Sequence, residues 1–282
     1  MHSDLEELQD KIKTIANLPT LPHIASKLMK IISSPNTNAD MVAALVAQDV
    51  SLSAKVLRLA NSAFYGIPKS VNTLKSAVVV LGFKIIHTMV LSLTVFDMFG
   101  KNDSKKAIFD REAFWQHSLK CGTTARLLAQ KRKQNMPLDP EEAFCAGLLH
   151  DVGKVVMEQY LHTDFHKALL YARAHRISGF EAEKHVLGYT HSDVALWLTT
   201  SWSLPDEILQ PLIYHHEPDS AQNCSDSVIL CHTADILSHA DDEFDVNELL
   251  PQIKAVGITP QELTDIIQKI PAEMEKASGF IN

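Results

Sequence analysis

The feature that most constrains this chain is an apolar run of 21 residues, from Ser76 to Phe96. A single bilayer-spanning helix needs about 20 apolar residues, so the run is long enough to cross a membrane. However, Lys84 and His87 fall in its middle, and a lysine at the bilayer centre costs about 2.5–3.5 kcal/mol on insertion scales. Gly82 supplies a natural break between two halves. The run therefore predicts two short helices that are buried in a protein core.

The rest of the chain has helical patterns and no convincing strand pattern. Apolar side chains recur at three- and four-residue spacing from Val42 to Leu59 and from Phe114 to Leu128. Residues 139–142 (Asp-Pro-Glu-Glu) and 259–262 (Thr-Pro-Gln-Glu) each combine a capping residue, a proline for the first helical position and a glutamate that closes a capping box. No segment alternates Val, Ile or Thr with period two between turn residues. The predicted fold class is all-α.

The distribution of histidine divides the chain into parts. All but three of the 14 histidines lie between His117 and His239, and the polar segment 101–106 precedes this region. We expect a two-lobed helical protein in which residues 1–102 form an N-terminal lobe of five or six helices. This lobe is expected to pack on a helical bundle of residues 103–240. Residues 241–282 are expected to form a C-terminal tail of two short amphipathic helices.

Composition argues against several classes of partner. The net charge is −8, the pI is near 5.9 and no basic cluster is present, so DNA is not an expected partner. The four cysteines lack the spacing of a zinc knuckle or a redox pair, which predicts buried thiols in a reducing compartment. The first residues are acidic and lack the apolar region of a secretory signal. We therefore expect a cytoplasmic protein without a membrane partner.

The candidate chemistry begins at His150-Asp151, within the sequence LLHDVGK of residues 148–154. Imidazole and carboxylate groups each bind divalent cations, and the apolar residues before this pair predict a buried cleft, where charges need a partner. If the segment is helical, Lys154 shares one side with both residues. Gly153 would allow close approach of a neighbouring helix or of a phosphate. Two interpretations stay open: Asp151 bridges two cations, or it forms an ion pair with Lys154 beside a core histidine.

Other residues in apolar helical stretches could complete a two-metal site. These candidates are His117, His191, His215, His216 and Asp235. Each histidine also has an interpretation without a metal. His117 could be a hydrogen-bonded core residue, and His191 could be a residue near a helix start without a role. One histidine of the pair 215–216 could be a cation that stabilises a helix C-terminus. Neighbours on a helix point about 100° apart, so the adjacent pair could reach two different metals. Asp235 is the strongest single candidate, because an aspartate among apolar neighbours needs a partner.

A further pair, His162 and His166, has the four-residue spacing of a metal-binding pair. The residues between them lack the glutamate of the zinc-protease pattern, and Lys167 and Arg173 lie on the same segment. The pair therefore predicts a solvated helix face. Nucleophilic schemes built on Ser-His-Asp or Cys-His are excluded, because neither a glycine elbow nor an activated cysteine is present.

The array of histidines and aspartates resembles the HD superfamily of metal-dependent phosphohydrolases. Residues 14–240 resemble its HDOD branch, which consists of bacterial signalling modules. The matching segments are LPTLP (18–22), DVSLSAKVLRLANSAFYG (49–66), residues 70–82 ending in AVVVLG, FWQHS (114–118), GYTH (188–191), and residues 202–218 from WSLP to HHEP.

The resemblance implies a site for two divalent metals, which polarise a phosphodiester and activate a water. By position it implies seven metal ligands, with the first aspartate bridging: His117, His150, Asp151, His191, His215, His216 and Asp235. It also implies catalytic roles for Asp151 and for Lys154, which would assist at the substrate phosphate. Five imidazoles and two carboxylates suit Fe, Mn or Zn better than Ca or Mg. The Gly-Tyr-Pro signature of the related HD-GYP cyclic-di-GMP phosphodiesterases is absent, because no glycine lies between His216 and Gly257.

We therefore predict a bacterial signal-transduction protein that retains the di-metal site and hydrolyses a phosphodiester or phosphomonoester, with a phosphate ester or nucleotide as ligand. The alternative is a non-catalytic regulatory or scaffold module. In that case a metal stabilises the fold, and the groove between the lobes binds a signalling protein or a nucleotide without hydrolysis. Many HDOD members have lost metal ligands, which keeps this alternative open.

Overall fold

A computed structural model describes residues 22–32, 34–99, 108–132, 138–199, 202, 204–223, 225–239 and 249–278 of the 282. Within these ranges the secondary structure consists of helices and connecting turns, and no strand occurs in them. The predicted all-α fold class is confirmed. The predicted domain boundaries near residues 102 and 240, the polar segment 101–106, residues 18–21 and Cys224 lie outside the described residues. The other three cysteines are free and buried, as predicted.

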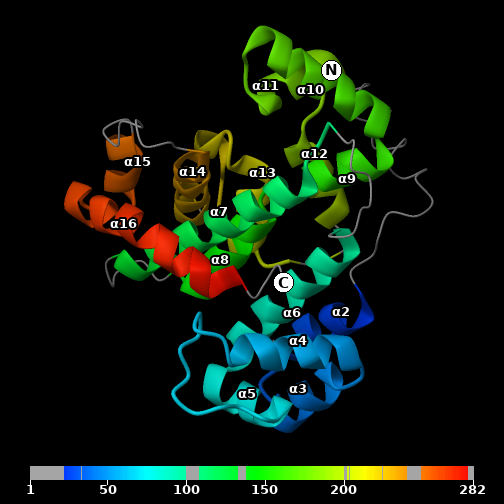
Figure 1. Cartoon of the computed structure of the whole chain (residues 1–282), viewed down its shortest axis with the longest axis vertical. Coiled ribbons are helices and arrows are strands. Elements are labelled where there is room, and N and C mark those ends of the chain that lie inside the picture. The colour runs from blue at the N-terminus through cyan, green and yellow to red at the C-terminus, as the bar shows by residue number, and fades with distance from the viewer. Residues whose placement is uncertain are drawn as a thin grey trace.

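The N-terminal lobe has five helices in its described part, and they lie together at one end of the molecule (Figure 1, blue to cyan). Their bounds are α2 His23–Ile32, α3 Ala39–Val46, α4 Val50–Ala60, α5 Leu74–Leu81 and α6 Phe83–Phe99. The helical pattern predicted from Val42 to Leu59 is split between α3 and α4. The split occurs because Asp49 caps a new helix, where its side chain accepts a hydrogen bond from the backbone N–H of Leu52 at 2.9 Å.

The apolar run forms two helices, α5 and α6, as predicted, but only α5 is short, since α6 has 17 residues. They meet at Gly82, whose φ of 86° suits glycine, and they are bent by 118°. In the part of the chain that the structure describes, no helix by itself is long and apolar enough to cross a membrane, although this bent pair passes that test together. All residues from Thr88 to Val95 in α6 are buried, and α6 contacts α2, α4 and α5 of its own lobe. The protein core therefore covers the middle of α6, whereas Val79 and Val80 of the same run are exposed on α5, so the prediction that the whole run is buried is wrong there.

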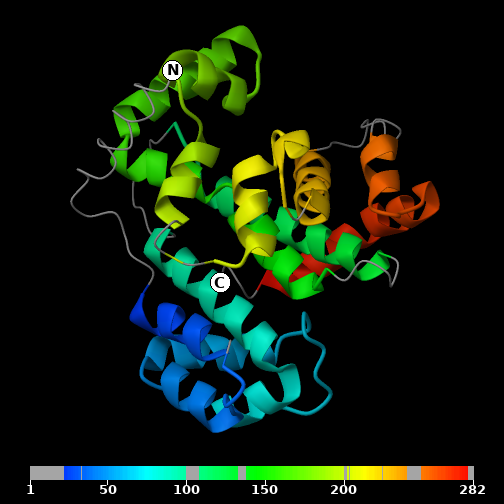
Figure 2. The same cartoon turned by 180° about the vertical axis from the view of Figure 1, so that it is seen from behind.

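The second lobe is a helical bundle around α7. Its elements are α7 Arg111–Lys131, α8 Pro140–Leu149, α9 Val152–Tyr160, α10 His162–His175, α11 Gly179–Leu187, α12 His191–Thr199, α13 Asp206–Tyr214, the 3-10 helix η1 Pro218–Ser220 and α14 Ser225–His239. The backbones of α7 and α8 touch, since a Cβ on Gly147 would lie 2.8 Å from the Cα of Gly122. Seen from behind, α13 and α14 lie side by side (Figure 2, yellow and orange). Helices α10 and α11 pack together at the end of the molecule opposite the N-terminal lobe.

The two predicted helix starts differ in detail. Asp139 caps α8 by accepting a hydrogen bond from the backbone N–H of Glu141 at 2.9 Å. The predicted capping box does not form there, because the Glu142 carboxylate lies 3.2 Å from Lys84 Nζ of the other lobe. At the second start, Thr259 and Glu262 form the predicted box at the beginning of α16. The box at the second start is confirmed, and the one at the first start is wrong.

The C-terminal tail contains α15 Leu250–Ala255 and α16 Pro260–Ala277 in its described part. The prediction of two short helices is correct for α15 and wrong for α16, which has 18 residues. Pro271 lies inside α16 without ending it. Helix α16 (Figure 1, red) packs against α7, and its apolar side, including Leu263 and Ile266, completes a second core cluster there.

The two lobes share one apolar core. It extends from Leu28 in α2, through α6, to Trp202 in the second lobe. Helix α6 of the first lobe contacts α8 of the second, and α8 leads directly to His150. The N-terminal lobe therefore packs on the helical bundle as predicted, next to the helix that positions the candidate site.

Candidate metal centre

His150 and Asp151 lie at the junction of two helices, where α8 ends at Leu149 and α9 begins at Val152. The segment is therefore not one continuous helix, and the shared helical side considered for His150, Asp151 and Lys154 does not apply to it. Both residues are buried, with exposed fractions of 0% and 1%. Lys154 in the first turn of α9 places its Nζ 2.5 Å from Asp151 Oδ2. The ion pair between Asp151 and Lys154, one of the two interpretations of this segment, is therefore present. Whether Asp151 can also bridge two cations depends on which side chains surround its two oxygens.

Gly153 brings α12 against this junction. A Cβ on Gly153 would lie 1.9 Å from the backbone carbonyl oxygen of His191, the first residue of α12. Only a glycine allows the two backbones to approach so closely. Of the two predicted reasons for this glycine, the close approach of a neighbouring helix is confirmed.

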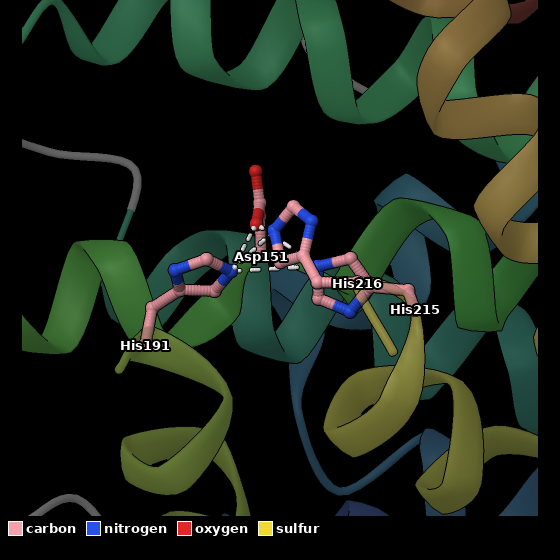
Figure 3. A group of neighbouring side chains, drawn as sticks. All are labelled: Asp151, His191, His215 and His216. Atoms are coloured by element: carbon pink, nitrogen blue, oxygen red, sulfur yellow. Dashed lines mark hydrogen bonds and ion pairs between the residues drawn. The ribbon is translucent and has the colours of Figure 1, made fainter. Parts of the chain in front are cut away.

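The structure brings all seven predicted ligand residues together in two adjacent clusters. The first cluster contains Asp151, His191, His215 and His216, whose side chains point toward one another (Figure 3). The second cluster contains His117, His150 and Asp235. Within each cluster, one ligand atom from every residue lies within 4.8 Å of the others. The side chains come from α7, α12, α14, the α8–α9 junction and the C-terminal end of α13.

The Asp151 carboxylate joins the two clusters. Its Oδ1 lies 3.1 Å from His191 Nε2 and 3.6 Å from His215 Nε2. Its Oδ2 lies 3.3 Å from His150 Nε2 and 3.7 Å from His117 Nε2. One carboxylate oxygen therefore faces each cluster, which is the arrangement of a carboxylate that can bridge two cations.

Asp235 completes the second cluster. Its Oδ1 lies 3.1 Å from His117 Nε2 and 3.4 Å from His150 Nε2. The expectation that this aspartate has a partner among its apolar neighbours is confirmed, because these two imidazoles contact it. Asp235 Oδ1 and Asp151 Oδ1 are nevertheless buried without a geometrically sound hydrogen bond. A cation in each cluster would satisfy both oxygens.

Hydrogen bonds on the outer side of three rings orient the histidines. His150 Nδ1 donates to the carbonyl oxygen of Gly147 at 2.7 Å, and His215 Nδ1 donates to that of Pro211 at 2.9 Å. His191 Nδ1 donates to a carboxylate at 2.7 Å. A neutral ring that donates through Nδ1 turns the lone pair of Nε2 toward the clusters, which is how metal-binding histidines are held.

The imidazole nitrogens face one another across short distances. His191 Nε2 lies 3.4 Å from His215 Nε2 and 3.1 Å from His216 Nε2. Two lone pairs at such distances repel unless a proton or a cation lies between them. The donor set of five imidazoles and two carboxylates therefore fits divalent transition metals.

Burial and neighbouring charges set the protonation of the site. Burial lowers the pKa of His215 to about 4 and also lowers the pKa of His216, so both rings favour the neutral form that binds metals. Burial acts to lower the pKa of His150, but Asp151 and Asp235 raise it well above its usual value, so this ring carries a proton where no cation takes its place. Burial alone would raise the pKa of Asp151, but the charges of protonated His150 and of Lys154 hold it well below its usual range. Burial also acts to lower the pKa of Lys154, and the nearby carboxylates, Asp151 first, raise it above its usual value. Asp151 is thus ionised and Lys154 carries its charge.

Two residues near the clusters were missed in the sequence. Glu183 in α11 accepts hydrogen bonds at one oxygen from the backbone N–H and from Nδ1 of His191, at 2.8 and 2.7 Å. His239 lies with its Nε2 3.5 Å from Asp235 Oδ1 and stacks on the His117 ring. His239 could have been found from its four-residue spacing to Asp235. Glu183 carries no such signal, because it resembles any glutamate of an amphipathic helix.

A pocket of about 360 Å³ opens beside the clusters. Its polar wall includes Asp151 and Lys154, and its apolar wall includes Phe109, Phe165 and Leu169. The residues that line the pocket lie between Ile108 and His239, so the pocket belongs to the second lobe. The pocket thus combines an ionised carboxylate, a charged amine and an apolar wall.

The pair His162 and His166 forms a separate group with Glu158. The prediction of a solvated face holds for His162, whose side chain is 57% exposed. It is wrong for His166, whose side chain is only 16% exposed and donates to Glu158 Oε2 at 2.9 Å. No glutamate lies between the two histidines in the sequence, but Glu158 of the preceding helix α9 contacts both rings.

The described part of the chain is helical and carries two adjacent clusters of histidine and aspartate. The chain matches the family described as the HDOD domain over residues 18–218, and it belongs to this family. It is similar to a crystal structure of an HDOD domain protein of unknown function from Geobacter sulfurreducens. The TM-score is 0.84 and the identity 23%, over 99% of this chain and 98% of that one.

Two other proteins are similar to this chain. One is a crystal structure of a protein from Shewanella amazonensis SB2B, provisionally named a phosphohydrolase, with a TM-score of 0.75, 24% identity and 98% coverage of both chains. The other is an uncharacterized protein of Treponema pallidum (strain Nichols), 26% identical over 211 residues and 72% of this chain. The chain spans 38% of the length of that relative. At these identities the two solved structures establish the fold.

Proposed function

We propose that this protein is a metal-dependent phosphohydrolase of bacterial signal transduction, which acts on a phosphomonoester or a phosphodiester. The observation that carries the proposal is the position of Asp151. This carboxylate turns one oxygen toward each cluster, and Lys154 Nζ lies 2.5 Å from it at the edge of the pocket. The provisional name of the Shewanella amazonensis protein supports the same class of reaction.

In this function the two clusters would hold two transition-metal ions (Fe, Mn or Zn), and Asp151 would contribute to both ligand sets. Bound metals would supply Lewis-acid polarisation of the phosphoryl group and activation of a water. The Lys154 ammonium binds the phosphate and neutralises part of its charge. Glu183 holds His191 in position through its two hydrogen bonds. The apolar wall at Phe109 and Phe165 excludes water from one side of the substrate.

The ligand of the pocket is a phosphate ester or a nucleotide in this proposal. The negative net charge and the absence of a basic cluster from the sequence disfavour DNA. We propose that the protein acts in the cytoplasm, in agreement with the three cysteines among the described residues, which are free and buried.

Metal content tests the proposal. Protein purified without chelator is expected to hold about two transition-metal ions per chain by elemental analysis. Asp151→Ala is expected to lose most of this metal. Asp164→Ala, which removes a 46% exposed aspartate from α10, is the matched control and is expected to keep the metal. A well-folded wild type that stays metal-free after reconstitution with Fe, Mn and Zn would refute the proposal.

Turnover completes the test. Phosphate release is measured with an aryl phosphomonoester, an aryl phosphodiester, nucleoside phosphates and cyclic dinucleotides. The metal-loaded wild type and Asp164→Ala are expected to hydrolyse at least one class at equal rates, whereas Asp151→Ala is expected to lose this activity. Metal-loaded wild type that hydrolyses none of them would contradict catalysis and favour the alternative.

The alternative is a non-catalytic scaffold module that binds a signalling protein. The observation that favours it is a set of exposed apolar side chains in the N-terminal lobe: Val50 is 83% exposed, Val79 67% and Val80 55%. A contiguous patch of such side chains is typical of an interaction surface, and Val79 and Val80 are neighbours on α5. In this case Asp151→Ala would lower the thermal stability without changing any turnover, because the metal would serve only the fold.

A further inference from the structure

Glu158, His162 and His166 form a third group of metal-ligating side chains, outside the two clusters. Glu158 lies near the end of α9, and the two histidines lie in the first two turns of α10. Their spacing of four residues at each step continues across the α9–α10 junction. The three side chains therefore converge, although the helices that carry them are separate.

The Glu158 carboxylate is buried, with a side chain that is 3% exposed, and it divides its oxygens between the two rings. Oε1 lies 3.1 Å from His162 Nδ1, and Oε2 lies 2.9 Å from His166 Nε2. The centroids of the two rings are 3.8 Å apart. One nitrogen from each ring and one carboxylate oxygen lie within 4.8 Å of one another.

These distances are close to those of a tetrahedral zinc site. With metal–ligand lengths of about 2.0–2.2 Å, two ligand atoms of a tetrahedral site are about 3.3–3.6 Å apart. The oxygen–nitrogen distances of 2.9 and 3.1 Å are a few tenths of an ångström shorter than this. They end on different carboxylate oxygens, so Glu158 would bind the ion through both oxygens or turn until one oxygen faces both nitrogens. His162 is 57% exposed, which leaves an entry path and room for a water as the fourth ligand.

We propose that Glu158, His162 and His166 form a second, mononuclear site for a divalent transition metal, with Zn²⁺ as its preferred ion. Two imidazoles and one carboxylate are a ligand set that zinc uses in proteins. The site is independent of the two clusters, since it shares no ligand with them.

The position of the site gives it a structural consequence. Helix α9 carries Lys154 in its first turn and Glu158 one turn later, while α10 carries Phe165 and Leu169 of the pocket wall. A metal bound across the junction fixes the first helix against the second. Zinc at this site thus holds the apolar wall of the pocket against the helix that contributes Lys154.

The test uses the full chain saturated with ZnCl2 and then dialysed, because Zn²⁺ would displace a weaker ion such as Mn²⁺ from the clusters. Elemental analysis is expected to find one zinc per chain beyond those that the two clusters hold. His162→Gln and His166→Gln are each expected to hold one zinc fewer per chain than the wild type. His162→Gln changes a largely exposed side chain, so its fold is expected to stay intact. His175→Gln, at an exposed position of the same helix, is the control that keeps the zinc.

Cobalt distinguishes the site from the clusters. Co²⁺ added to the Asp151→Asn variant is expected to give the visible bands of a four-coordinate ion, and these bands are expected to vanish when His162→Gln is added to that variant. Zinc or cobalt binding that is the same in wild type, His162→Gln and His166→Gln would overturn the proposal. So would a wild type that takes up no further metal, which would leave a hydrogen-bonded Glu–His network at this junction. Either result is independent of whether the protein hydrolyses phosphate esters.

Discussion

The contact between Gly153 and His191 makes a sharp prediction for Gly153→Ala. A Cβ at this position would lie 1.9 Å from the His191 carbonyl oxygen, and real Cβ atoms essentially never approach closer than 3.0 Å. The backbone of α12 therefore has to move by at least about 1.1 Å. Overpacking of this kind destabilises a folded protein by about 1–3 kcal/mol. The expected fall in Tm is roughly 2–12 °C for a chain of this size.

The same displacement reaches the metal centre. His191 is held by Glu183 through contacts of 2.7 and 2.8 Å, and its Nε2 lies 3.1 Å from Asp151 Oδ1. A shift of about 1 Å breaks at least one of these contacts, and misplacements of this size cost about 100-fold in rate. Gly153→Ala is thus expected to lose metal and turnover together with stability.

Gly179→Ala is the matched control. A Cβ on Gly179 would have no atom within 4 Å, and this residue begins α11 with an ordinary φ. The control is expected to stay within about 0.5 kcal/mol of wild type. The assays are thermal unfolding and elemental analysis of the two variants side by side. If Gly153→Ala matches Gly179→Ala in both Tm and metal content, the argument from backbone contact is refuted.

Three further predictions concern other parts of the chain. Burial lowers the pKa of His87 to about 4, whereas the unfolded chain protonates it near 6.5, so stability is expected to fall as the pH drops from 6.5 to 4, by about 3 kcal/mol in total. Urea unfolding from pH 7 to 4.5 is expected to show a flatter profile for His87→Gln, and parallel profiles would contradict this. Glu183→Gln is expected to weaken metal affinity about 10–100-fold in a chelator competition, because it removes the charge that orients His191; an unchanged affinity would show that the hydrogen bond is dispensable. Arg126→Ala leaves the buried Glu141, which its Nε contacts at 2.8 Å, without its cation, and is expected to cost about 3–5 kcal/mol in urea unfolding. A loss below about 1 kcal/mol would place that ion pair among the weak surface pairs.

Much of the candidate site is readable from the sequence, because the seven residues are polar groups within apolar helical patterns. Histidine and aspartate at such positions must turn toward the core, and a core has few places where polar groups can meet. His239 also follows from spacing, since it stands one helical turn after Asp235. These residues were open to prediction because local pattern alone decides which way they point.

The parts that escaped prediction depend on packing between distant segments. The break at His150 and Asp151 has no local signal, and the glycines on either side of it, Gly147 and Gly153, lie against α7 and α12, which the sequence does not place. Glu158 and Glu183 look like surface glutamates of amphipathic helices, and only their burial, 4% and 1% exposed, shows otherwise. Helix propensity and periodicity carry no information about which helix covers which face.

The core that α6 shares with α8 has a thermodynamic consequence. Because the two lobes bury apolar surface in common, neither lobe can shift without changing the packing free energy of α8, the helix that ends next to His150. A partner that binds the N-terminal lobe and favours one packing of α6 on α8 would therefore alter the affinity of the metal centre. By linkage, metal or substrate at the centre would alter the affinity for that partner by the same factor.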